Sequence, residues 1–307
     1  MKPTVLDLFA GCGGFSHGFA QAGFKVLGFV EWWKPAITTF LKNHPNAFHI
    51  GTDITKVPHE TLVFYKGKVD IIVGGPPCQG FSLCGKRDPK DNRNKLYKEF
   101  LRFVSVIEPR LVVMENVKGL LSMRNQKNEF VIHNIVQDFI RLNYSVCYKI
   151  LKASDYNVPQ DRERLIIIAV KLNIFPQPYD KIVTVSEALQ NIQLDCNAHE
   201  FLDTTPAILE RIKTLKQGEK LSNKFNFCRQ RLEADKPSKT IVTKPLYIHP
   251  TEDRFLTPRE LARLQSFPDE FEFTGSKTSI IEQIGNAVPP LLSYSLAEKI
   301  MEVFYDG

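Results

Sequence analysis

Residues 7–19 read DLFAGCGGFSHGF, and this stretch decides the class of fold. The apolar run Thr4–Phe9 predicts a strand, and glycines follow it at Gly11, Gly13 and Gly14. Glycine carries no side chain, so a turn of this kind lets the backbone approach a ligand closely and hold it at the N-terminus of the next helix. The spacing differs from the G-x-G-x-x-G of NAD-binding proteins, which leaves other adenosine-bearing cofactors open.

Short β-branched runs alternate with helical patterns over the first part of the chain. Further strands are expected at 25–30, 47–50, 69–73, 111–115, 145–151 and 165–170, and helices at 95–107 and 130–142. Such alternation predicts an α/β fold, with a doubly wound, mostly parallel sheet covered by helices on both faces.

The pattern changes after residue 172. Pro176 and Pro178 indicate a linker, and an irregular segment rich in lysine follows. We therefore expect a smaller domain over residues 173–277, with residues 1–172 and 278–307 forming the larger one.

Basic residues outnumber acidic residues between positions 211 and 244. In isolation such a run is most simply a solvated basic surface. Helix signals return at Thr257, an expected N-cap, and Pro258, and residues 290–304 are expected to form a closing helix.

The composition is that of an ordinary globular protein: 307 residues, 43% hydrophobic and 24% charged. Its six cysteines are scattered, so neither a disulfide framework nor a metal site is expected. No run approaches the roughly 18 apolar residues of a membrane span, and no signal peptide is evident, which predicts a cytoplasmic protein. The net charge of +6 suits a polyanionic partner.

Acids and an aromatic residue follow the second and third expected strands. Glu31 and Trp32 come after the second strand, and Asp53 and Ile54 after the third. Taken singly, each acid is a strand-end cap or a loop residue. Taken in order at the carboxyl ends of parallel strands, they predict an adenosine pocket, with acids for the ribose and the exocyclic amine and an aromatic for the purine.

The fourth strand leads into GGPPCQGFS, Gly74–Ser82. Two prolines fix the backbone there and present Cys78 at the edge of the sheet. A lone cysteine is ordinarily a buried small hydrophobe, but this position favours a nucleophile, which attacks as the thiolate.

Polar residues at two further sites complete the set. Glu115 and Asn116 end the fifth strand, where a carboxyl group could bind the edge of a heterocycle or serve as a general acid. In QDRER, Arg162 and Arg164 alternate and share a face, so they could hold a base oxygen and a phosphate; a surface ion pair with Asp161 or Glu163 is the alternative.

Together these motifs resemble the DNA (cytosine-5) methyltransferase family. The ordered set is DLFAGCGG, EWW, GTDI, GGPPCQGFS, ENVKGLL, QDRER, RELARLQSFP and GNAVPP. The resemblance implies a Rossmann-like S-adenosylmethionine-dependent methyltransferase domain that the C-terminal helix rejoins. It also implies a small target-recognition domain between QDRER and RELARLQSFP.

The resemblance assigns roles residue by residue. S-adenosylmethionine would be bound by Phe9, Gly11, Gly13, Gly14, Glu31, Trp32, Asp53, Ile54, Pro76, Asn286 and Val288. Catalysis would involve Cys78 as nucleophile, with Glu115, Asn116, Val117, Gln160, Arg162 and Arg164. DNA would be contacted by Ser82, Lys86, Arg93, Arg229, Arg231 and Lys239.

The implied reaction methylates C5 of a cytosine flipped out of double-stranded DNA, through a covalent bond between Cys78 and C6, and releases S-adenosylhomocysteine without a metal. The basic loop after Cys78 would close over the base. A monomeric modification enzyme is expected, with a restriction endonuclease acting separately. The alternatives are a transfer-RNA cytosine-5 methyltransferase of the same family and a catalytically silent DNA-binding homologue.

Overall fold

The computed structural model describes residues 2–77, 96–125, 127–170, 174–193, 195–222, 229–244 and 247–305. Its centre is a seven-stranded sheet in the order β3-β2-β1-β4-β5-β8-β6. These strands are β1 (Thr4–Leu8), β2 (Lys25–Val30), β3 (Phe48–Gly51), β4 (Ile71–Gly74), β5 (Leu111–Val117), β6 (Val146–Lys152) and β8 (Glu163–Ala169). All seven strands expected from the sequence are present.

The sheet is mostly parallel, as predicted. Strands β1 to β5 pair in parallel, whereas β8 runs antiparallel to both β5 and β6. The reversal brings the start of β8 to the carboxyl end of β5, with Val117 opposite Arg164.

Helices cover both faces because successive side chains of a strand point to opposite sides. Ile72 and Val112 pack in one cluster, with the helices α3 (His59–Tyr65), α4 (Leu96–Ile107) and α5 (Val131–Arg141). Ile71 and Val113 pack in another, with α1 (Gly14–Gln21) and α10 (Pro290–Tyr305). The sheet is therefore doubly wound, and the remaining helix of this part, α2 (Lys34–Asn43), packs through Phe40 against Phe29.

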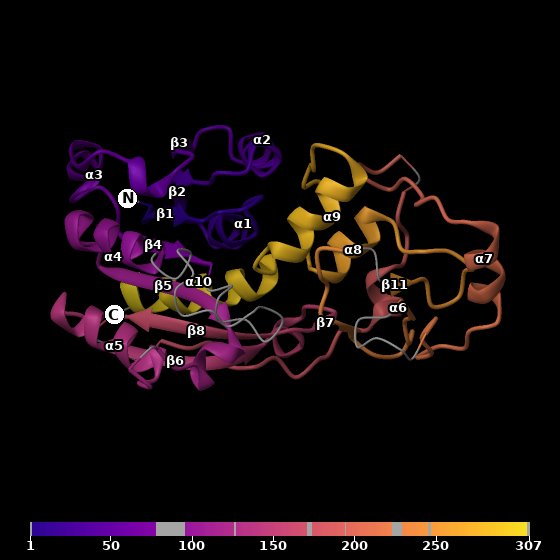
Figure 1. Cartoon of the computed structure of the whole chain (residues 1–307). Helices are drawn as coiled ribbons and strands as arrows, with labels where there is room; N and C mark the ends of the chain where they lie inside the picture. The colour runs from indigo at the N-terminus through magenta and orange to yellow at the C-terminus, as the bar shows by residue number, and fades with distance from the viewer. Residues whose placement is uncertain are drawn as a thin grey trace.

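A smaller lobe extends from the sheet (Figure 1). It holds the helices α6 (Val185–Ala188), α7 (Pro206–Lys213), α8 (Pro258–Leu264) and α9 (Lys277–Asn286), and the two-residue strands β9 (Gln230–Arg231), β10 (Ser238–Lys239) and β11 (Tyr247–Ile248). Thr257 caps α8 in a capping box with Glu260, as the sequence indicates.

The chain returns to the sheet through two helices, α9 and α10. Ile280 and Ile284 of α9 pack with Leu232 and Phe267 of the smaller lobe. The next helix, α10, packs against the sheet and α1. Figure 1 shows these yellow helices running from the smaller lobe back to the sheet. In the described part of the chain, no helix combines the length and apolarity needed to cross a membrane.

Candidate active site

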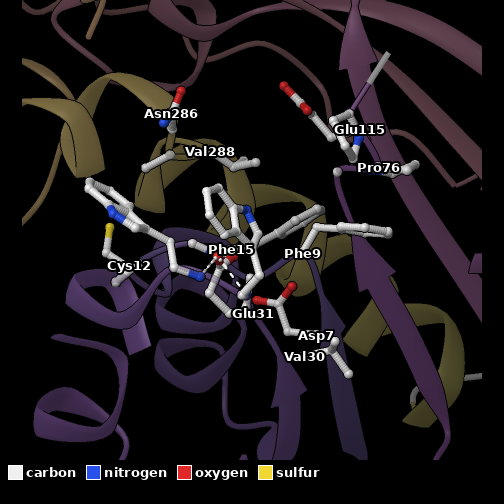
Figure 2. Close-up of a pocket in the computed structure, with 18 of the residues that line it drawn as sticks. Asp7, Phe9, Cys12, Phe15, Val30, Glu31, Pro76, Glu115, Asn286 and Val288 are labelled. Carbon is white, nitrogen blue, oxygen red and sulfur yellow. Dashed lines mark hydrogen bonds between the residues drawn. The ribbon is translucent and has the colours of Figure 1, made fainter. Parts of the chain in front are cut away.

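A cavity of about 920 Å³ lies at the carboxyl ends of the parallel strands. Its walls come from the segments that follow β1, β2, β3 and β4, from the end of β5 and the start of β8, and from the turn between α9 and α10. Figure 2 shows Glu31 on the sheet side of this pocket and Asn286 and Val288 on the opposite side. The ends of the first three strands, where the sequence predicts an adenosine pocket, all line this cavity.

The glycine turn contributes to the pocket through one glycine. Gly11 has φ +55, lines the pocket, and would place a Cβ in open space. Gly13 has φ +97 and approaches the Phe40 ring, while a Cβ at Gly14 would lie 2.4 Å from the Val288 carbonyl oxygen. The side of each of these two glycines on which a Cβ would stand is therefore filled by protein, and their contact with the cofactor stays a prediction.

The Glu31 carboxylate is fixed by main-chain donors. It accepts hydrogen bonds from the backbone N–H of Gly11 (2.9 Å), Trp32 (2.9 Å) and Trp33 (2.8 Å). Burial raises the pKa of Glu31, and these three donors oppose that rise. Beside it, Trp32 is 74% exposed and lines the pocket, so a flat aromatic surface lies open next to an oriented acid.

Asp53 lies at the rim of the pocket as the cap of a short 3-10 helix, Ile54–Lys56. Its Oδ1 accepts from the backbone N–H of Thr55 at 3.0 Å and from the Thr55 hydroxyl at 2.7 Å. Hydrogen bonds from Thr55 lower the pKa of Asp53. The cap holds this carboxylate in place, while Ile54 is buried beneath it.

One acid of the pocket wall was missed by the sequence reasoning. Asp7 is 1% exposed, lines the pocket, and accepts a 2.7 Å hydrogen bond from the Ser16 hydroxyl at Oδ2. Burial raises the pKa of Asp7 to about 7. The available signal was an acid inside an otherwise apolar strand, TVLDLF.

Glu115 and Arg164 form an ion pair at the other end of the pocket. Arg164 Nε lies 2.7 Å from Glu115 Oε1, and the side chains of Arg164 and Glu115 are 15% and 14% exposed. Val117 lies opposite Arg164 in the ladder, which puts Glu115 on the diagonal and on the same face. Neither Asp161 nor Glu163 takes the expected alternative role, because Asp161 pairs with Lys152 and Glu163 with Lys118.

The segment that leads to Cys78 lies against this pair. A Cβ at Gly75 would lie 3.1 Å from Glu115 Oε2. The Asn116 side-chain amide donates to the Pro76 carbonyl at 3.1 Å and accepts from the backbone N–H of Val117 at 2.9 Å. Asn116 therefore joins the segment after β4 to the end of β5.

Arg162 and Gln160 are both buried, and of the two only Arg162 lines the pocket. Arg162 is 3% exposed, and its terminal nitrogens donate to the carbonyls of Ile241, Gly285 and Ala287 at 3.0 to 3.2 Å. It lines the pocket, and main-chain oxygens accept from both terminal nitrogens, whereas its buried Nε has no hydrogen-bond partner among the described residues. Gln160 is fully buried and lies outside the described pocket wall.

A model of the C-5 cytosine-specific DNA methylase family matches residues 3–302. The chain belongs to this family. It is 35% identical over 369 residues to the type II methyltransferase M.DdeI of Desulfomicrobium norvegicum, covering 98% of this chain and 89% of that protein. It is 37% identical over 329 residues to the type II methyltransferase M1.HphI of Haemophilus parahaemolyticus, covering 99% and 88%.

A solved structure agrees with this family membership. A prophage-encoded E. coli protein assigned as a DNA modification methyltransferase matches with a TM-score of 0.82 at 30% identity, over 98% of this chain and 99% of that one. The methyltransferase family and fold predicted from the sequence are therefore confirmed.

In this member of the family, the predicted DNA-contact residues of the smaller lobe differ in exposure. Lys239 is exposed, and Arg229 is half-buried with its guanidinium 5.0 Å from the centre of the Phe255 ring. Arg231 was expected to face DNA but is 4% exposed: it pairs with Asp253 and donates to the carbonyls of Ile212, His249 and Glu252. The prediction of a surface contact for Arg231 is wrong, because its guanidinium holds the lobe together from inside.

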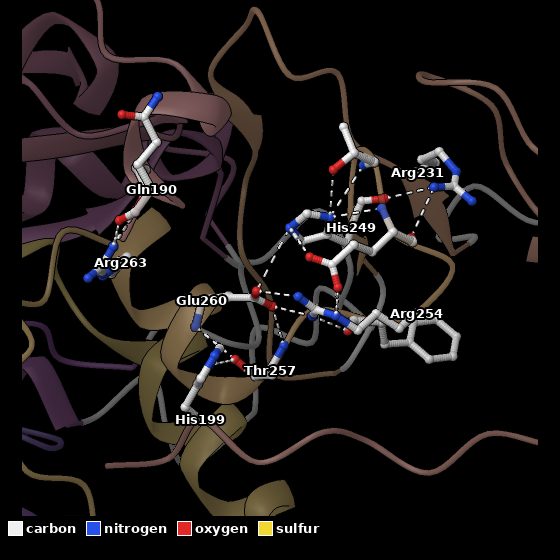
Figure 3. A network of polar contacts seen from close by, with 12 residues as sticks. Gln190, His199, Arg231, His249, Arg254, Thr257, Glu260 and Arg263 are labelled. Carbon is white, nitrogen blue, oxygen red and sulfur yellow. Dashed lines mark hydrogen bonds and ion pairs between the residues drawn. The ribbon is translucent and has the colours of Figure 1, made fainter. Parts of the chain in front are cut away.

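Figure 3 shows the wider polar network around Arg231. Arg254 donates to both carboxylate oxygens of Glu260 at 2.7 Å, and the backbone N–H of Glu252 donates to the His249 ring at 3.0 Å. The carboxylate of Glu260 also accepts from the backbone N–H of Thr257, the residue that caps α8. A lobe with little regular structure is thus held by buried polar contacts.

Four predicted site residues lie outside the described residues: Cys78, Ser82, Lys86 and Arg93. The described chain ends at Pro77 and resumes at Leu96, and both residues line the pocket. Among the residues that the structure describes, no three His, Cys, Asp or Glu side chains are grouped so as to hold a metal ion.

Proposed function

We propose that this protein transfers a methyl group from S-adenosylmethionine to C5 of a cytosine in a short, specific sequence of double-stranded DNA. The observation that carries the proposal is the Glu115–Arg164 pair, largely buried inside the pocket at the end of β5. Gly75, three residues before Cys78, lies against the same carboxylate. A carboxyl group and a guanidinium held together in this way present acceptors and donors to the polar edge of a base.

The opposite part of the pocket fits the cofactor. The open space beside Gly11 leaves room for a ligand close to the backbone. Glu31 retains acceptor capacity for ribose hydroxyls because its carboxylate oxygens have more lone pairs than the three main-chain donors use. Trp32 offers a face to a purine, and Asn286 and Val288 complete the wall. When bound there, S-adenosylmethionine would supply an electrophilic methyl group on its sulfonium.

The proposed chemistry uses Cys78 as the nucleophile. Its thiolate adds to C6 of the cytosine while Glu115 binds N3 and the exocyclic amine, which makes C5 nucleophilic. After C5 takes the methyl group, a base removes the C5 proton and the Cys78–C6 bond breaks, which restores the thiolate. Covalent catalysis divides one difficult step into easier ones. In this proposal Arg164 orients Glu115 and faces the cytosine.

The substrate assignment rests on the family and on the smaller lobe. The named relatives are type II methyltransferases, so we propose a modification enzyme of a restriction-modification system, with any endonuclease acting separately. The exposed basic side chains of the smaller lobe would bind the phosphates of the DNA backbone. The cytosine would be flipped into the pocket at a cost of a few kcal/mol. A cytoplasmic monomer is proposed.

Trapping tests the chemistry. DNA in which 5-fluorocytosine replaces cytosine is incubated with the protein and cofactor. The protein is then digested, and the masses of its peptides are measured by mass spectrometry. Because fluorine blocks the removal of a proton from C5, we expect a stable adduct on Cys78. An adduct on Cys84, or none, would refute the mechanism.

A further inference from the structure

Three buried polar side chains lie where the smaller lobe meets the sheet. Gln160, Arg162 and Gln265 are 0%, 3% and 0% exposed. The first two are neighbours in one segment, and Gln265 lies 105 residues after Gln160. The side-chain amide of Gln160 donates directly to that of Gln265. We call these three residues the interlobe clamp. Figure 1 shows β7 (Gln160–Asp161), which carries the first of them, at the junction between the two lobes.

On one side the clamp holds the backbone of the smaller lobe. The N–H of Ile241 donates to Gln160 Oε1 at 2.6 Å, and its carbonyl accepts from Arg162 at 3.0 Å. The preceding residues pair as a ladder, because β10 runs parallel to β7 with Ser238 opposite Gln160. Both backbone polar groups of Ile241 are therefore held by Gln160 and Arg162.

On its other side the clamp holds the turn between α9 and α10. The Gln265 amide donates to the carbonyls of Ile284 (3.0 Å) and Ala287 (2.8 Å), and Arg162 donates to Gly285 (3.2 Å) and Ala287 (3.1 Å). Ala287, with its neighbours Asn286 and Val288, lines the pocket, whereas Gln160 and Gln265 lie outside its described wall.

The two held segments are also in direct contact. A Cβ at Gly285 would lie 2.5 Å from the backbone carbon of Val242 and 2.6 Å from the nitrogen of Thr243. Only a glycine permits this approach of the two backbones. The clamp and the contact at Gly285 together join the 238–243 segment to the pocket wall.

We propose that Gln160, Arg162 and Gln265 are positioning residues that set the cofactor-side wall of the pocket relative to the smaller lobe. The inference rests on the proposed cofactor. Hydrogen bonds inside a buried site are strong and leave unpaired groups when broken. Loss of Gln265 or Arg162 therefore removes one of the two donors that hold the Ala287 carbonyl, and loss of Gln160 removes the amide bonded to Gln265. Cofactor affinity then depends on Gln160 and Gln265, which lie outside the described pocket wall, and on Arg162, which lines the pocket and holds this wall in place.

The test measures the affinity for S-adenosylhomocysteine by isothermal titration calorimetry. Gln265→Glu replaces an amide donor by a carboxylate facing two carbonyl oxygens, and Gln265→Met keeps the buried volume without the donors. Both variants are expected to raise the Kd about tenfold or more. The matched control is Thr257→Ala, which removes the cap of the same helix, α8, without touching the clamp, so it lowers stability and keeps the Kd within about twofold.

A second readout separates positioning from catalysis. The KM for S-adenosylmethionine should rise in the Gln265 variants while kcat at saturating cofactor stays near the wild-type value. An unchanged Kd in either folded variant, or a loss confined to kcat, would overturn the clamp. Absence of S-adenosylhomocysteine binding by the wild-type protein would instead overturn the proposed function and the clamp with it.

Discussion

Arg164 and Glu115 meet across an antiparallel pair of strands, with Arg164 Nε 2.7 Å from Glu115 Oε1. The reversed direction of β8 makes this contact possible, because it brings the start of that strand to the end of β5. Both side chains line the pocket and retain 14–15% exposure, so they remain reachable from it. The proposed cytosine site is therefore built on two rigid strands.

Replacing the carboxyl group tests its role. Glu115→Gln keeps the size of the side chain but loses the ion pair and the group proposed to bind N3 of the base. We expect kcat to fall by at least about 100-fold, with binding of S-adenosylhomocysteine unchanged. Glu163→Gln on the same strand as Arg164 is the matched control, because its exposed pair with Lys118 contributes little. Turnover of Glu115→Gln close to that of the control would exclude the assigned role.

The exposed indole of Trp32 is expected to serve binding and not folding. Trp32→Ala should raise the Kd for S-adenosylhomocysteine about tenfold or more, since a purine would lose its stacking partner. Phe48→Ala provides the comparison, because Phe48 is similarly exposed at 70% and lies outside the described pocket wall. Neither change should alter the melting temperature appreciably. Equal affinities of the two variants would show that the ligand does not use Trp32.

Asp7 should make stability fall with rising pH. Its pKa is raised by burial from an ordinary 3.8 to about 7 in the folded protein. Between those values the unfolded chain has lost the proton that the folded chain still binds, so the contribution of Asp7 to stability decreases as pH rises through this window. Asp7→Asn does not titrate and can keep the bond from Ser16. The melting temperature of Asp7→Asn relative to wild type should increase from pH 5 to pH 8. A difference between the two melting temperatures that does not change with pH would contradict the raised pKa of Asp7.

The exposed lysines of the smaller lobe are expected to bind phosphates. Changing Lys220, Lys236, Lys239 and Lys244 to Gln should flatten the dependence of DNA affinity on salt, by about 0.9 in the logarithmic slope for each phosphate that a lysine no longer neutralises. Arg231→Gln is the contrasting variant: it should lower the melting temperature, because the buried carbonyls lose their donors. An unchanged salt slope in the lysine variant would mean that this surface faces away from DNA.

The alternation of apolar runs was sufficient to predict the seven strands of the sheet. It could not give the direction of β8, because a pattern with a period of two is the same in either direction. It also could not assign α9 to the smaller lobe, since an amphipathic helix does not specify its partner.

In the site, strand-end positions predicted that Glu31, Trp32 and Glu115 would line one pocket. The burial of Arg162 was not predictable, because its partners are main-chain oxygens 79 to 125 residues away in the chain. Arg231 was misplaced for the same reason, since a basic run does not show which of its members turns inward.

Bisulfite sequencing of plasmid DNA treated with the purified protein and S-adenosylmethionine tests the central claim most directly. The account predicts protected cytosines at one short recurring sequence, and none after treatment with Cys78→Ser protein that still binds DNA and cofactor. Methylation that persists in Cys78→Ser would contradict the mechanism. Unmodified plasmid together with methylated transfer RNA would contradict the proposed substrate.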